Sequence, residues 1–190
     1  MSLNILGGVA KGFSLVTPKS FKTRPTSILL KRRLFDSIQD FSGCTFIDLC
    51  AGSGSIGLEA LSRNAHTTYL VELNSQALSC IKTNTKKLNE KYLELGECFV
   101  HKDDCIKWLN KNQGILSSND NLLFFDPPYE MIELYKKFFV TIRGLNYQGK
   151  IIVEACTQKT MGLNEFGDLF GEPDKIFKQG TSFFAIYDFK

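Results

Sequence analysis

Between residues 42 and 155, short apolar runs alternate with amphipathic stretches, and this alternation limits the possible folds more than any other feature. The apolar runs predict strands at residues 45–51, 67–72, 97–101, 122–126 and 150–155. The stretches between them predict helices at residues 55–63, 75–88, 105–110 and 131–143. Because parallel strands joined by helices must be covered on both faces, the sequence predicts an α/β fold with a mostly parallel sheet and helices on both sides.

The two ends of the chain depart from this alternation. Three further elements are expected there: a hairpin within residues 3–16, a helix from Thr26 or Ser27, and a hairpin within residues 175–190. The first hairpin surrounds Gly7-Gly8, and the last one turns near Gln179-Gly180. We therefore expect a single domain over residues 1–190, made of a short N-terminal hairpin-plus-helix extension and an α/β core.

Charge is distributed unevenly between the extension, residues 1–41, and the core, residues 42–190. Residues 1–38 contain seven basic residues and one acidic residue, a net charge of +6, so the remaining 152 residues carry −3. This asymmetry indicates a basic arm that meets a polyanion, and a solvated surface is the alternative interpretation. In the expected helix Leu30, Leu34 and Ile38 repeat every four residues, which leaves Lys31, Arg32 and Arg33 mostly on its outer side. The candidate RNA-binding residues are Lys11, Lys22, Arg24, Lys31, Arg32 and Arg33.

The six cysteines are scattered through the chain without a Cys-x-x-Cys pair. Their spacing supports neither a zinc site nor a disulfide framework, so no metal is expected, and a reducing cytoplasm is the simplest location. The chain starts without the long apolar stretch of a secretory signal. No apolar run approaches the ~20 residues that cross a bilayer, so no membrane association is expected.

A glycine-rich turn follows the first strand of the core. Residues 52–57 read Gly-Ser-Gly-Ser-Ile-Gly, which matches the pattern Gly-x-Gly-x-x-Gly, and Glu72 ends the next strand. The glycines permit a sharp turn, the next helix offers free N–H groups, and the acid could bind ribose hydroxyls. These features are compatible with a nicotinamide-dependent oxidoreductase. Glycines that only form a tight turn are the structural alternative.

Two carboxylates favour S-adenosylmethionine over a dinucleotide. Asp48 precedes the turn, where it would repel a pyrophosphate but would suit a sulfonium ligand that also carries an ammonium group. Asp104 follows the third strand, where it could accept a hydrogen bond from an adenine amino group or cap the next helix, and these roles can coexist. The candidate residues for binding the methyl donor are Asp48, Ala51, Gly52, Ser53, Gly54, Glu72, Asp104 and Cys105.

The stretch 122–130, LLFFDPPYE, decides between these interpretations. An exocyclic base amine is a poor nucleophile, because its lone pair is delocalised into the ring. Hydrogen-bond acceptors for both N–H bonds turn that lone pair toward a sulfonium methyl group, and Asp126 and the Pro127 carbonyl are the expected acceptors. Pro128 fixes the direction of that carbonyl, and Tyr129 offers a face for stacking. The candidate catalytic residues are therefore Asp126, Pro127, Pro128 and Tyr129, and a capped Pro-Pro turn is the structural alternative.

Taken together, the motifs resemble the RsmD family of bacterial methyltransferases. The resemblance covers roughly residues 3–155 and rests on residues 4–12 (NILGGVAKG), 24–26 (RPT), 48–63 (DLCAGSGSIGLEALSR) and 126–129 (DPPY). It implies a Rossmann-like fold, S-adenosylmethionine as methyl donor, and transfer to a guanine N2 amine of 16S ribosomal RNA. The expected partner is the small ribosomal subunit or its assembly intermediate. The resemblance implies catalytic roles for residues 126–129 and methyl-donor binding for residues 48–54 and Glu72.

The chain departs from the family pattern in its basic extension. Leu30-Lys31-Arg32 stands where the family usually has Val-Arg-Glu, and Asn4 stands where the Gly-Gly motif usually opens with Arg. Two alternative functions remain open at this point. One is a methyltransferase for adenine N6 of DNA or RNA or for a protein glutamine, and such enzymes more often have Asn at the position of Asp126. The other is a non-catalytic RNA-binding ribosome assembly factor.

Overall fold

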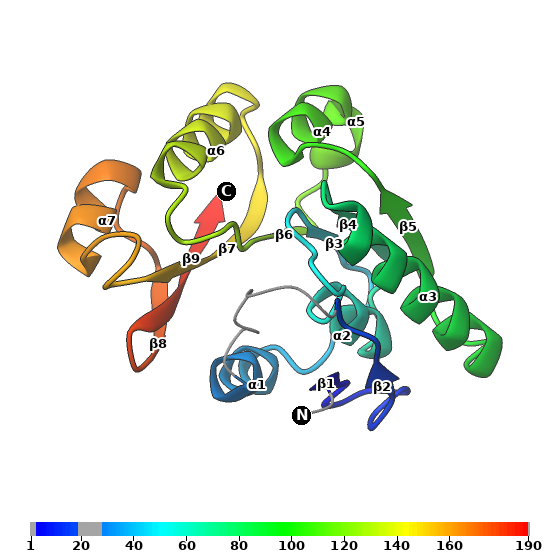
Figure 1. Cartoon of the computed structure of the whole chain (residues 1–190). Coiled ribbons are helices and arrows are strands. Elements are labelled where there is room, and N and C mark those ends of the chain that lie inside the picture. Colours follow the sequence, from blue (N-terminus) through cyan, green and yellow to red (C-terminus); the bar gives the residue numbers. More distant parts are fainter. Residues whose placement is uncertain (1–2, 19–27, 190) are drawn as a thin grey trace.

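A computed structural model describes residues 3–18 and 28–189, and its centre is a seven-stranded sheet (Figure 1). The strands of this sheet are β3 (Thr45–Asp48), β4 (Thr67–Val71), β5 (Glu97–His101), β6 (Asn121–Phe125), β7 (Gly149–Cys156), β8 (Lys175–Gln179) and β9 (Ser182–Phe189). They lie in the order β5–β4–β3–β6–β7–β9–β8. The first five are parallel, whereas β9 runs antiparallel to both β7 and β8.

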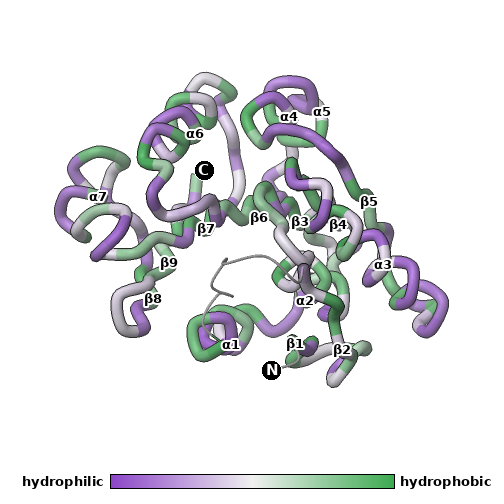
Figure 2. Tube along the Cα trace, viewed as in Figure 1, coloured by the Kyte–Doolittle hydropathy of each residue, from purple (hydrophilic) through white to green (hydrophobic). Residues whose placement is uncertain are grey.

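Helices cover both faces of the sheet. They are α1 (Ile28–Ser37), α2 (Gly57–Ser62), α3 (Ser75–Lys91), α4 (Cys105–Lys111), α5 (Gln113–Leu116), α6 (Ile132–Gly144) and α7 (Leu163–Phe170). Buried residues of α4 to α7 form one apolar cluster with the sheet, and those of α1, α2 and α3 form two others with its opposite face. The central strands are coloured mainly hydrophobic in Figure 2, as expected for strands that are buried on both sides.

The fold predicted from the sequence is confirmed, with differences at particular elements. The first core strand ends at Asp48 rather than at residue 51, because the chain turns sharply at Gly52 and Gly54, which have φ values of +56° and +80°. The C-terminal hairpin is present as β8 and β9, with Gln179 paired with Ser182. Helices α5 and α7 were not predicted. No helix within residues 3–18 and 28–189 combines the length and apolar character needed to cross a membrane.

The N-terminal hairpin consists of β1 (Leu3–Asn4) and β2 (Ser14–Leu15) and packs tightly on the end of α2. The Val9 N–H donates to the Ser62 carbonyl at 2.7 Å, and the Ala10 N–H donates to Ser62 Oγ at 2.9 Å. Gly8 has φ +73°, and a Cβ on it would lie 1.8 Å from the Ser62 carbonyl oxygen. The hairpin can therefore approach α2 this closely only with glycine at position 8.

A matched pair of glycine substitutions tests this contact. Gly12 has φ +84°, but a Cβ on it would meet no atom within 4 Å. We expect Gly12→Ala to lower the free energy of unfolding by about 1–2 kcal/mol, since only the left-handed backbone is strained. We expect Gly8→Ala to lower it by roughly 2 kcal/mol more, because the hairpin must also move away from α2. Urea denaturation measures both values, and equal losses would contradict the proposed close contact.

Candidate active site

The sheet order brings the carboxyl ends of three neighbouring strands together. Strand β3 lies between β4 and β6, and Asp48 at its end is level with Leu70 of β4 and Phe124 of β6. The segments that follow these strands therefore begin at one edge of the sheet, where ligands bind in open α/β folds. They are the glycine loop, which we define as residues 49–56, the turn at Glu72, and the segment that starts at Asp126.

The glycine loop is held by backbone hydrogen bonds and leaves open space beside it. The Ala51 N–H donates to the Val71 carbonyl at 3.0 Å, and the Gly54 N–H donates to the Ala51 carbonyl at 2.7 Å. A Cβ on Gly52 would meet no atom within 4 Å, so a side chain there would project into unfilled space. The loop therefore provides the kind of cradle that a bound nucleoside requires.

Glu72 holds the glycine loop with the carboxylate that the sequence assigned to ribose. Its Oε2 accepts from the Gly52 N–H at 2.8 Å, and its Oε1 accepts from the Asn74 N–H at 2.7 Å. Each carboxylate oxygen has a further lone pair with which it can accept from a hydroxyl group. Glu72 is thus compatible with both roles, loop support and ribose binding.

Asp48 lies beneath the loop and is almost completely buried, with 2% of its surface exposed. Its Oδ2 accepts from the Gly57 N–H, at the start of α2, at 3.2 Å. Burial raises the pKa of Asp48 to about 7, and the neighbouring Glu72 carboxylate adds to this rise. The Gly57 N–H and the Lys31 ammonium group act in the opposite direction. Two carboxylates beside one loop make this edge suitable for a cationic ligand.

Asp104 is the N-cap of α4, which is one of the two roles that the sequence predicted for it. Its Oδ1 accepts from the Lys107 N–H at 3.0 Å. The thiol of Cys105, which follows it, is buried and hydrogen-bonded with that of Cys50. This hydrogen bond and burial raise the pKa of Cys50 well above its usual range. The same hydrogen bond lowers the pKa of Cys105, so the two thiols are shifted in opposite directions.

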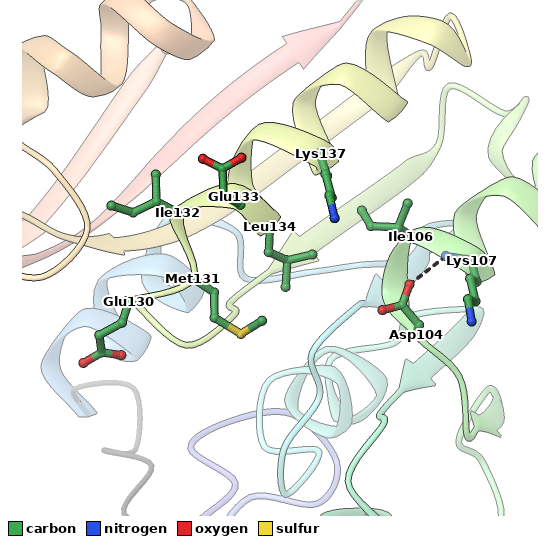
Figure 3. Close-up of a pocket in the computed structure, with 9 residues that line it drawn as sticks. All are labelled: Asp104, Ile106, Lys107, Glu130, Met131, Ile132, Glu133, Leu134 and Lys137. Atoms are coloured by element: carbon green, nitrogen blue, oxygen red, sulfur yellow. Dashed lines mark hydrogen bonds between the residues drawn. The ribbon is translucent and has the colours of Figure 1, made fainter.

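A cavity of about 550 Å³ joins Asp104 to the segment that follows Tyr129. Figure 3 shows Met131 and Leu134 pointing from the α6 side toward Asp104 and Ile106 on the α4 side. The remaining lining residues are Lys107, Glu130, Ile132, Glu133 and Lys137. The lining combines apolar side chains with three acids and two lysines, and the Asp104 carboxylate is suited to the amino group of a planar ring.

The DPPY segment is anchored through two residues that sequence reasoning missed, Glu154 and Tyr135. The Tyr129 hydroxyl donates to Glu154 Oε1 at 2.7 Å, and it lies 3.2 Å from Ser182 Oγ. Burial and the Glu154 carboxylate raise the pKa of Tyr129, so its hydroxyl stays protonated. The Tyr135 hydroxyl donates to the Glu154 carbonyl at 2.8 Å and lies 3.5 Å from the Pro127 carbonyl oxygen. An isolated acid inside the apolar strand 151–155 was the available signal for Glu154.

The basic residues of the extension do not all lie where the sequence placed them. The expectation that Lys31 is on the outer side of α1 is wrong: only 2% of the residue is exposed, and its Nζ lies 3.1 Å from Glu59 Oε2. Its ammonium group is therefore not available to RNA phosphates. Arg32, Arg33 and Lys11 are exposed. The predicted RNA contacts Lys22 and Arg24 lie outside the described residues.

Comparison with known proteins places the chain in a family. The family described as Conserved hypothetical protein 95 matches residues 3–184. The chain belongs to this family. YlbH of Bacillus subtilis is 32% identical over 130 residues, which are 67% of this chain and 67% of that protein. Ribosomal RNA small subunit methyltransferase D of Buchnera aphidicola is 30% identical over 128 residues, which are 66% of this chain and 62% of that protein.

A solved structure confirms the architecture over the whole chain. The yhhF protein of Escherichia coli superposes with a TM-score of 0.76 at 21% identity, covering 100% of this chain and 99% of that one. This chain spans about two thirds of the length of the curated relatives named above. The predicted RsmD family and its Rossmann-like methyltransferase fold are thereby confirmed, and with them S-adenosylmethionine as the methyl donor of the family.

The burial of Asp48 predicts a specific pH dependence of stability. The carboxyl group titrates near 3.8 when unfolded and near 7 when folded, so the folded state holds its proton more tightly between these values. Stability is therefore lost as the pH rises through this window, by up to about 4 kcal/mol. Asp48→Asn keeps the acceptor for Gly57 but does not titrate. We therefore compare the free energy of unfolding of Asp48→Asn with that of the unsubstituted chain at each pH. We expect this difference to favour Asp48→Asn more at pH 8 than at pH 5.

Urea denaturation at both pH values measures this difference. Asp36→Asn, which removes an exposed carboxylate from α1, is the matched control. A difference between Asp48→Asn and the unsubstituted chain that does not change with pH would contradict the raised pKa.

Proposed function

We propose that this protein transfers a methyl group from S-adenosylmethionine to the exocyclic N2 amine of a guanine in 16S ribosomal RNA. The observation that carries the proposal is the position of Asp126. It directly follows β6, and β6 pairs with β3, which the glycine loop follows. An acid and a proline carbonyl next to a methyl-donor site are suited to an amine acceptor. Residues 42–190 serve as the catalytic core and residues 1–41 as the basic extension of one domain.

The residues at the sheet edge fit the methyl donor. Bound S-adenosylmethionine supplies an electrophilic methyl group on a positively charged sulfur. Asp48 and Glu72 provide negative charge beside the glycine loop, and Glu72 retains lone pairs for ribose hydroxyls. The cavity between α4 and α6 accommodates the adenine ring, with Asp104 as acceptor for its amino group.

The chain's own groups orient the target amine. Asp126 and the Pro127 carbonyl accept its two N–H bonds, which directs the nitrogen lone pair away from the ring and toward the methyl group. The new N–C bond forms as the C–S bond breaks, and the proton lost from nitrogen passes to the Asp126 carboxylate. Tyr129, fixed by its hydroxyl bond to Glu154, supports the base from one side. The target guanine must be unpaired or flipped out to reach these groups.

The family relationship and the charge of the extension support ribosomal RNA as the target. A relative at 30% identity is named ribosomal RNA small subunit methyltransferase D. Lys11, Arg32 and Arg33 are exposed and provide positive charge for RNA phosphates. The corresponding partner is the small ribosomal subunit or its assembly intermediate, which places the reaction in the cytoplasm.

A labelled-nucleoside assay tests the proposed reaction. Purified protein is incubated with radiolabelled S-adenosylmethionine and small-subunit RNA or particles that lack the modification, and the RNA is then digested to nucleosides. We expect the label in N2-methylguanosine. Label in N6-methyladenosine or in protein glutamine would contradict guanine N2 as the target and identify adenine or glutamine instead. Absence of any transfer to RNA, particle or protein would favour a non-catalytic assembly factor.

Substitution of the acid separates catalysis from binding. We expect Asp126→Ala to lower the rate of methyl transfer by at least about 100-fold, because the amine loses its charged acceptor. We expect the affinity for S-adenosylhomocysteine, measured by calorimetry, to change less than about threefold. Turnover that survives this substitution would remove Asp126 from the mechanism.

The salt dependence of RNA binding tests the role of the exposed arginines on α1. We expect the double substitution Arg32→Ala and Arg33→Ala to reduce the slope of log affinity against log salt by about one to two, because each phosphate contact contributes to that slope. Filter binding over a range of salt concentrations measures the slope. Lys82→Ala with Lys87→Ala, which removes two exposed charges from α3, is the matched control and should leave it unchanged. Equal slopes for both double variants would contradict the assignment.

A further inference from the structure

The glycine loop is contacted from behind by a lysine of the N-terminal extension. Lys31 Nζ donates to the Ser55 carbonyl at 2.8 Å and forms an ion pair with Glu59 Oε2 at 3.1 Å. Burying an ammonium group costs several kcal/mol unless it is paired and hydrogen-bonded. The two acceptors meet this requirement, and one of them is the backbone of the glycine loop.

The partner of this lysine, Glu59 on α2, also holds the N-terminal hairpin. Its Oε2 accepts from the Leu6 N–H at 2.7 Å, and its Oε1 accepts from the Gly7 N–H at 2.8 Å and from Arg63 Nε at 2.9 Å. No part of the Glu59 side chain is exposed. One buried carboxylate thus connects the hairpin, α1 and α2, and α2 begins directly after the glycine loop.

A second buried side chain reaches the loop from α3. Asn84 Oδ1 accepts from the Val16 N–H at 2.8 Å, and its Nδ2 donates to the Val16 carbonyl at 3.0 Å and to the Ser53 carbonyl at 3.1 Å. Asn84 has no exposed surface. Asn84 therefore links the glycine loop to the N-terminal extension. Lys31, which belongs to the extension, makes the corresponding link directly.

The two contacts fix the orientation of two peptide groups in the loop, which are separated by the peptide between Gly54 and Ser55. A peptide is planar and trans, so a carbonyl that is held in one direction fixes the next N–H in the opposite direction. The Ser53 carbonyl bond therefore orients the Gly54 N–H, and the Ser55 carbonyl bond orients the Ile56 N–H. Between them, Gly54 has φ +80°, a backbone conformation that glycine adopts readily.

We propose that Lys31 and Asn84 are positioning residues for methyl-donor binding, which hold the Ser53 and Ser55 carbonyls so that the glycine loop is preorganised for its ligand. This inference rests on the proposed function only in taking S-adenosylmethionine as the ligand of the loop. The extension then has two separate roles: its buried Lys31 shapes the methyl-donor site, and its exposed arginines face the RNA.

Calorimetric titration of the full chain with S-adenosylhomocysteine, in the absence of RNA, tests the proposal. We expect Lys31→Met to raise the Kd about tenfold, because the Ser55 carbonyl loses its only charged hydrogen-bond donor among the described residues. Glu59 keeps its three other donors, so the melting temperature should fall only slightly. Lys31→Arg retains donors for both acceptors and should restore the Kd to within about threefold. Lys87→Met, an exposed change on α3, is the matched control.

Asn84→Asp provides an independent variant of nearly the same size. It still accepts from the Val16 N–H but loses both donors, including the one to the Ser53 carbonyl, so we expect a raised Kd here too. In turnover, the KM for the methyl donor should rise while the KM for RNA stays constant. Unchanged Kd values in both variants would overturn the proposal, as would a loss of affinity in Lys31→Met that Lys31→Arg does not restore. Because RNA is absent from the titration, a wrong RNA target would not affect these outcomes.

Discussion

The parallel pairing of β3 with β4 and β6 is the constraint on which the site depends. It places Asp48, Glu72 and Asp126 at one edge of the sheet, although 78 residues separate the first from the last. The Glu72 carboxylate raises the pKa of Asp48, and the same negative charge disfavours an anionic ligand, so a dinucleotide phosphate suits this edge poorly. A ligand with a positively charged sulfur and an ammonium group complements this negative charge. The sheet order and the chemistry of these side chains thus support the proposed methyl transfer to an amine.

Behind this edge, the structure uses buried polar groups where apolar ones would pack at lower cost. Replacing a buried ion pair by apolar residues of similar volume is often neutral or stabilising, so the Lys31–Glu59 pair is poorly explained by stability alone. The pair contributes directional hydrogen bonds, because charged and amide groups donate and accept only within a limited range of angles. Through such hydrogen bonds Glu59 positions the hairpin, and Lys31 and Asn84 hold two carbonyls of the glycine loop. The hairpin and α1 are in this sense structural components of the catalytic core.

Periodic patterns gave most of the fold from the sequence, and they failed where the period is short or interrupted. The parallel strands and the longer helices were predicted within a few residues, since their apolar runs are long. Helix α5 has only four residues, and α7 contains Gly167 within an eight-residue segment, so neither offered a sustained pattern. The glycine loop and DPPY segment were recognised because their chemistry is local in sequence. Glu154 was missed because its partner Tyr129 is 25 residues away and only β7 and the folded DPPY turn bring them together.

The error at Lys31 shows which information the helical pattern lacked. The predicted apolar stripe of Leu30, Leu34 and Ile38 is narrower than the observed buried face of α1, which also includes Lys31 and Phe35. A lysine beside an apolar stripe is predicted to be exposed unless a buried acidic partner is known. Here the partner, Glu59, lies 28 residues further along the chain. Two of the three departures from the RsmD pattern in this helix concern charged residues, and they are of different kinds. Lysine for arginine at position 31 preserves the positive charge that Glu59 requires inside the protein. Arginine for glutamate at position 32 reverses a charge on the exposed face, where it can alter the proposed RNA contact without disturbing the methyl-donor site.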